Sequence, residues 1–173
     1  MVHCYYVPAT DTSSMTHEQQ IRQQLAKALD WGEAHADFQT AVADFPEDLR
    51  GEVPPGFSHS AWDLLEHLRI ALWDIVEFTK DARHKSPPWP SGYWPPTHEP
   101  PQEEAWDQCV ESITDLLEEM RGLILDRSRP LLEPFPRSQG QTLMREALLA
   151  ADHNAYHLGE IVQVRKALKA WPK

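Results

Sequence analysis

Apolar residues recur every three to four positions in four long segments of this 173-residue chain. That spacing places them on one face of an α-helix and predicts amphipathic helices rather than strands. We find no convincing strand and no internal repeat. The predicted helices cover residues 17–44, 61–80, 103–124 and 142–170.

Helix ends are marked by residues that suit them. Thr16 followed by Gln19 is typical of a capping box at the start of the first helix. Pro46 forbids helix at the preceding residue and so ends that helix near residue 44. The residues placed to cap the later helices are Ser58 or Ser60, and Thr142.

The connections between the helices are long and rich in proline. Residues 86–101 hold seven of the fifteen prolines, together with Trp89, Tyr93 and Trp94. Such a segment forms neither regular helix nor a central strand. Two interpretations stay open. The segment is a functional flap whose aromatic side chains pack over a cavity mouth, or it is a stiff connection on the surface.

Four long helices in a chain of this size predict an all-α fold, a four-helix bundle, in a single domain spanning residues 1–173. Residues 1–15 are predicted to form an N-terminal tail. Long connections permit crossovers, so a simple up-down-up-down order is not required.

Charge and composition exclude several classes of function. A net charge of −11 and a pI near 5.2 argue against nucleic-acid binding, which needs clustered Lys and Arg. The two cysteines, Cys4 and Cys109, form no Cys-x-x-Cys motif, so we expect a reduced, cytoplasmic setting. No signal pattern and no membrane-length apolar run is present, so we expect no membrane partner.

Candidate chemistry centres on His153 and His157, which lie four residues apart in the predicted helix 142–170. Both imidazoles therefore leave the same helical face, as two ligands of a divalent transition metal do. Nine histidines in 173 residues give about half an expected pair at this spacing by chance, so the motif alone is weak. A pair of polar residues at a bundle seam is the competing interpretation.

A third imidazole strengthens the hypothesis. If helix 61–80 packs beside helix 142–170, His67 can meet His153 and His157. Three protein ligands leave a coordination position open, which is typical of catalytic rather than structural sites. That position can take water or a substrate thiol. Three imidazoles suit zinc, nickel, copper and iron alike.

Other polar residues are weaker candidates. His35, on the apolar face of the predicted first helix, and Glu160 are candidates for proton transfer or substrate contact. Asp63, Asp74 and Glu160 are placed to accept a hydrogen bond from a ligand imidazole. His59 is a weaker candidate still. No role is predicted for His3, His17, His84 and His98.

Three segments, SHSAWDLLEHL at 58–68, YWP at 93–95 and ADHNAYHLGEI at 151–161, together resemble the DinB-like superfamily. The resemblance implies a four-helix bundle of up-down-down-up topology, often a homodimer, with a divalent metal held by three histidines. The family's histidines match His67, His153 and His157. The resemblance implies no DNA binding, in agreement with the acidic charge.

Relatives of known activity in that superfamily are metal-dependent enzymes that use low-molecular-weight thiols, including thiol S-transferases and a mycothiol-dependent isomerase. We therefore expect a metal-dependent enzyme, with zinc or nickel as the first candidates, that joins a low-molecular-weight thiol to a small electrophilic substrate. A metal-dependent hydrolase is the alternative enzyme. A non-enzymatic, dimeric metal-binding or interaction protein is the alternative from another class.

Overall fold

The computed structural model describes residues 15–30, 32–81, 83–136 and 138–172. Within these residues the chain forms five α-helices and two short 3-10 helices, and no strand. The predicted all-α class is confirmed. The predicted tail, residues 1–15, lies outside the described residues except for Met15. The helices are α1 (His17–Ala28), α2 (Phe38–Val42), α3 (Ala61–Lys80), α4 (Ala105–Leu125) and α5 (Leu143–Ala167), with η1 (Glu47–Leu49) and η2 (Ser91–Tyr93) between them.

Capping residues start three of the long helices where the sequence predicts. The side-chain oxygens of Thr16, Ser60 and Thr142 each accept a hydrogen bond from the backbone N–H three residues further on. These bonds satisfy donors that a helix start otherwise leaves free. At its other end α5 stops at Ala167, before the predicted residue 170, because Lys169 adopts a left-handed backbone with φ of 59°.

The prediction of one continuous helix over residues 17–44 is wrong. The chain leaves the helix after Ala28 and re-enters it at Phe38. Asp37 causes the restart, since its carboxylate accepts from the backbone N–H of Thr40 at 2.7 Å and caps α2. Apolar positions such as Phe38 and Val42 nevertheless reach the core, so the helical spacing continues across the break.

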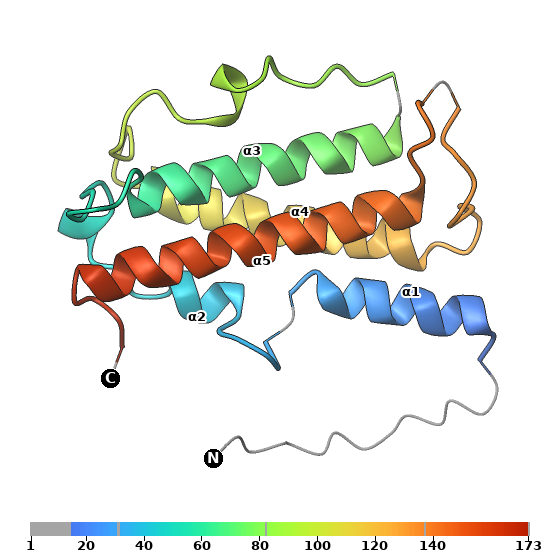
Figure 1. Ribbon diagram of the computed structural model, residues 1–173, viewed down its shortest axis with the longest axis horizontal. Helices are drawn as coiled ribbons and strands as arrows, with labels where there is room; N and C mark the ends of the chain where they lie inside the picture. Colours follow the sequence, from blue (N-terminus) through green and yellow to red (C-terminus); the bar gives the residue numbers. More distant parts are fainter. Residues whose placement is uncertain (1–14, 31, 82, 137, 173) are drawn as a thin grey trace.

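The four longer helices lie side by side (Figure 1). α3 packs against α4 and α5, and α1 packs against the same two helices from the other side. Figure 1 shows α1 and α5 running in one direction and α3 and α4 in the opposite one. Because α3 and α4 point the same way, the connection between them must return along the whole length of α3, as Figure 1 shows.

A single apolar core lies between these helices. Leu64, Leu72, Met120 and Ile161 are among its fully buried side chains, and they come from α3, α4 and α5. Burial of side chains of this kind stabilises the fold by roughly 1.5–3 kcal/mol each. Among the described residues, no helix is long and apolar enough to cross a membrane.

Candidate metal centre

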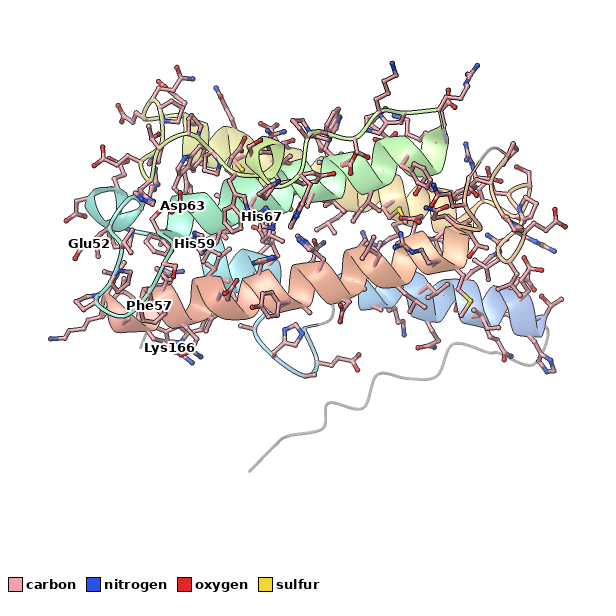
Figure 2. All side chains as sticks on the ribbon, turned by 45° about the horizontal axis from the view of Figure 1, so that its top comes forward. Glu52, Phe57, His59, Asp63, His67 and Lys166 are labelled. Atoms are coloured by element: carbon pink, nitrogen blue, oxygen red, sulfur yellow. The ribbon has the colours of Figure 1, made fainter. Side chains whose placement is uncertain are left out.

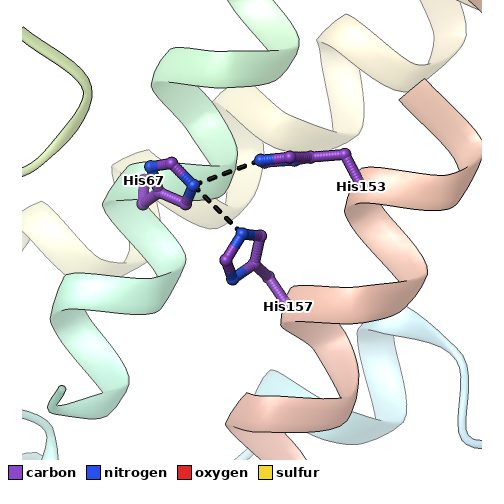
Figure 3. Close-up of side chains that lie close together, drawn as sticks. All are labelled: His67, His153 and His157. Atoms are coloured by element: carbon purple, nitrogen blue, oxygen red, sulfur yellow. Dashed lines mark hydrogen bonds between the residues drawn. The ribbon is translucent and has the colours of Figure 1, made fainter. Parts of the chain in front are cut away.

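Three histidines from two helices point their rings at one another in the space between α3 and α5 (Figure 3). His67 comes from α3, and His153 and His157 come from α5. The Nε2 atom of His67 lies 3.1 Å from the Nε2 atom of His153 and 3.1 Å from that of His157. The possible ligand atoms of all three lie within 4.8 Å of one another. We call this group the three-histidine cluster.

Local structure explains the convergence. His153 and His157 are separated by one helical turn, so both leave the same face of α5. That face packs against α3, which brings His67 opposite the pair. His67 and His157 retain only 2% and 9% of their solvent exposure. The sequence prediction that these three residues meet is therefore correct as geometry.

Hydrogen bonds to the outer ring nitrogens fix two of the three tautomers. The Nδ1–H of His67 donates to the backbone carbonyl of Tyr93 at 2.7 Å. The Nδ1–H of His157 donates to the carboxylate of Glu160 at 2.6 Å. A carbonyl and a carboxylate only accept, so each Nδ1 must carry the proton. In the neutral rings, the Nε2 atoms of His67 and His157 are then bare acceptors.

The rings are held neutral. Burial lowers the pKa of all three, and it brings the pKa of His153 and of His157 to about 4. The neighbouring imidazoles act in the same direction, since each would repel a second positive charge. At neutral pH the cluster therefore presents uncharged rings, as metal binding requires.

Two bare Nε2 atoms 3.1 Å apart, those of His67 and His157, form no hydrogen bond, because neither carries a proton to share. The Nδ1 atom of His153 is also buried without a partner. A cation between the three Nε2 atoms would turn the unfavourable acceptor–acceptor contact into coordination. Three neutral imidazoles are a donor set that divalent transition metals accept. The residues present thus fit such an ion.

The aromatic side chain of Trp94 covers one side of the cluster. Its ring stacks on His67 with 4.0 Å between centroids and 4° between planes. The Trp94 ring also stacks on the ring of His59, with 4.2 Å between centroids. Figure 2 shows His59 beside the start of α3, between Phe57 and His67. This stack limits solvent access to His67 and holds its ring plane.

A family model describes most of this chain: the DinB superfamily matches residues 30–161. The chain belongs to the DinB superfamily. The resemblance seen in the sequence is confirmed, and the matched range includes all three residues of the cluster. Membership and the cluster together are compatible with a metal-binding protein. Searches of curated proteins and of solved structures gave no significant match.

Of the carboxylates predicted to orient the imidazoles in this DinB superfamily member, one contacts the cluster and two contact histidines outside it. Glu160 does accept from a cluster ring, that of His157. Asp63 instead accepts from His98 at 2.5 Å, and Asp74 accepts from His84 at 2.9 Å. Neither aspartate has a hydrogen bond to His67.

Sequence reasoning therefore missed His84 and His98, to which it gave no role. Their partners lie 10 and 35 residues away in the chain. The sequence does show histidines in a proline-rich segment and aspartates on the preceding helix, and this was the only sign that they could pair. The register between loop and helix, which decides the pairing, is not visible in a sequence.

His35 lies apart from the cluster. It falls in the connection between α1 and α2 rather than in a helix, and its side chain is exposed. Its Nδ1 atom lies 2.9 Å from the carbonyl of Ala36. The ring borders a cavity of about 30 Å³ beneath this connection, which Asn154 also lines. His35 thus makes no contact with the three-histidine cluster that would support its predicted catalytic role.

A larger groove lies on the Glu160 side of the cluster. It encloses about 600 Å³ between α5 and the segment before α3. Phe57 and Tyr156 supply aromatic walls, and His59 and Glu160 supply polar ones. Because Glu160 also accepts from His157, the groove and the cluster share a side chain.

Proposed function

We propose that this protein is a metal-dependent enzyme in which His67, His153 and His157 bind one divalent transition metal, zinc or nickel before the others. The observation that carries the proposal is the 3.1 Å contact between Nε2 atoms that both lack a proton. Buried polar groups are normally paired, so such a contact calls for a cation. Three protein ligands leave a coordination position for a reactant.

The reaction we propose is transfer of a low-molecular-weight thiol to a small electrophilic substrate. A divalent metal at the site would lower the pKa of a thiol or water and so supply a nucleophile near neutral pH. Cys109 does not provide that thiol, because the residue is buried and burial raises the pKa of its thiol group. We propose that the thiol of the reaction comes from solution.

Each residue of the site has a proposed task. The cluster histidines hold the ion through Nε2. Glu160 keeps the His157 ring in the Nδ1–H tautomer, which leaves Nε2 free for coordination. The groove lined by Phe57, His59 and Tyr156 is proposed to receive the substrate, since its apolar walls meet a polar end at Glu160.

We also propose that the four longer helices make the up-down-down-up four-helix bundle implied by the family resemblance. The helix directions in Figure 1 support this topology. A cytoplasmic homodimer is the proposed assembly, and light scattering after size exclusion tests the dimer. A monomer at micromolar concentration would overturn that part of the proposal.

Activity assays test the reaction. Metal-loaded wild-type protein, His153→Ala and His17→Ala are each incubated with a low-molecular-weight thiol and 1-chloro-2,4-dinitrobenzene as the electrophile. His17 is an exposed histidine outside the cluster and serves as the matched control. We expect conjugation by the wild type and by His17→Ala, and none above background by His153→Ala.

The alternatives give different results. Hydrolysis of 4-nitrophenyl acetate without thiol, abolished by His153→Ala, would replace the transferase by a hydrolase. Tight metal binding with neither activity across a panel of thiols and electrophiles would favour the non-enzymatic metal-binding protein.

A further inference from the structure

The segment between α3 and α4, residues 83–104, lies along α3 and is tied to it at three points; we call it the strap (Figure 1). At one end, His84 pairs with Asp74. At the other, His98 pairs with Asp63. Between them the strap touches the cluster, where it contacts His67 through two consecutive residues, Tyr93 and Trp94.

Tyr93 connects two of these points by itself. Its hydroxyl donates to the carboxylate of Asp74 at 2.6 Å. Its backbone carbonyl accepts from the Nδ1–H of His67 at 2.7 Å. His67 and Asp74 are seven residues apart on α3, two helical turns and roughly 10 Å, so both lie on the face that the strap covers.

The carbonyl that fixes His67 has no regular secondary structure to hold it. Tyr93 ends the short helix η2, and the next residue, Trp94, is already extended with φ of −125° and ψ of 146°. The orientation of the Tyr93–Trp94 peptide therefore depends on the side chains on either side of it. The Trp94 ring stacks on His67 and His59, and the Tyr93 hydroxyl binds the α3 carboxylate of Asp74. Asp74 is the anchor of the Tyr93 side chain: it is only 14% exposed, and its two oxygens accept from different strap residues, Tyr93 and His84.

We propose that Asp74 and Tyr93 are positioning residues for the cluster: the Asp74–Tyr93 hydrogen bond holds the Tyr93 carbonyl, which in turn sets the ring orientation and Nδ1–H tautomer of His67. Neither residue touches the metal position. The inference on metal affinity rests on the proposed function, whereas the inference on the His67 tautomer holds for the metal-free protein.

The test compares Tyr93→Phe, Asp74→Leu, which removes the acceptor oxygens, and the double variant with the wild type. Zinc affinity is measured by competition with a chromophoric chelator. The ring nitrogens of His67 are followed in the metal-free proteins by ¹⁵N NMR, and far-UV circular dichroism monitors folding. Loss of an outer hydrogen-bond partner weakens metal binding by roughly 10- to 100-fold, and we expect each single variant to fall in that range.

Two features distinguish positioning from general loosening. The double variant should bind zinc about as weakly as either single variant, because both substitutions break the same connection. The matched control His98→Ala removes another histidine–aspartate contact between strap and α3, and it should leave zinc affinity and the His67 nitrogen shifts unchanged.

The outcomes are separable. Zinc affinity and His67 shifts like those of the wild type in both single variants would overturn the inference. Additive losses would also overturn it, because they mean that Asp74 does not act through Tyr93. An equal loss in His98→Ala would overturn it too, because it means that loosening any contact between strap and α3 weakens the site. If the wild type binds neither zinc nor any other divalent transition metal, the proposed function fails, and a changed His67 tautomer in Tyr93→Phe would still support the positioning role.

Discussion

Two regions of the molecule bury polar side chains between helices, and they satisfy those side chains in opposite ways. Arg165 of α5 is 1% exposed and donates to the backbone carbonyls of Ala41 and Ala170 at 2.8 and 2.9 Å. His157, two turns earlier on the same helix, is 9% exposed, and its Nε2 atom faces another bare Nε2 at 3.1 Å. Every guanidinium nitrogen of Arg165 donates a hydrogen bond within the protein, whereas no group of the described residues donates to the Nε2 atom of His157.

Arg22 of α1 repeats the arginine pattern at the other end of the molecule. Its guanidinium donates to the carbonyls of Ile124 and Arg129 at 2.6 and 2.5 Å and so ties α1 to the end of α4. Both arginines use donors to complete carbonyls that helix ends leave free. The comparison teaches that burial alone does not indicate a ligand site. A ligand site is indicated by a buried polar group that has no hydrogen-bond partner for one of its atoms.

The largest expected effect is stabilisation by metal at the histidine site alone. Zinc at about a thousand times its dissociation constant should raise the free energy of unfolding of the wild type by about 4 kcal/mol. His157→Ala should show no comparable rise, because a ligand is missing. Thermal unfolding with and without zinc measures the difference, and equal rises in both proteins would remove the distinction between the two regions.

Without metal, substitution of the buried arginine should destabilise the protein more than substitution of the cluster histidine. Arg165→Met leaves several buried carbonyls without a donor and should lower the free energy of unfolding by about 3 kcal/mol. His157→Leu should change it little, since it also removes a contact between two acceptors. Denaturant unfolding in the presence of a chelator compares them, with exposed Arg83→Met as the control that leaves the midpoint unchanged. A larger loss in His157→Leu would contradict the comparison.

The histidine region should also make the metal-free protein sensitive to acid. The pKa of His153 and His157 is about 4 in the folded protein, against 6.5 for an ordinary histidine. Between these values the unfolded chain binds more protons, so stability should fall as the pH is lowered from about 6.5 to about 4. Replacing both residues by leucine should flatten this part of the curve. An unchanged slope in that double variant would assign the acid sensitivity elsewhere.

The smallest expected effect concerns Glu160. In Glu160→Gln the side-chain oxygen can still accept from His157, but the charge that strengthens the bond is lost. Zinc affinity should fall by about 10-fold, the lower end of the range for outer partners of metal ligands. Chelator competition measures it. A loss as large as that of His157→Ala would make Glu160 a ligand rather than an orienting residue.

The sequence predicts the parts of this account that depend on helical spacing. The bounds of α3 and the meeting of His67 with His153 and His157 follow from apolar periodicity and an i, i+4 pair. The first helix was predicted as too long because Phe38 and Val42 continue the apolar spacing of α1 across a real break. Periodicity reports which face is buried and says little about whether the backbone between two buried positions is helical.

The strap contacts could not be predicted in the same way. The partner of His67 is the backbone carbonyl of Tyr93, an atom that every residue possesses and that carries no sequence signal. Asp74 was expected to orient a metal-ligand imidazole directly, yet it accepts from Tyr93 and from His84, which lies outside the three-histidine cluster. Such pairings depend on how a proline-rich segment lies against a helix, which is decided by tertiary packing.

Metal content tests the central claim most directly. Wild-type protein, His153→Ala and His17→Ala are prepared under identical metal-replete conditions, and bound transition metal per chain is measured by elemental analysis. The account predicts near-stoichiometric metal in the wild type and in His17→Ala, and almost none in His153→Ala. Little metal in the wild type, or equal metal in all three proteins, would contradict a metal site at the three-histidine cluster.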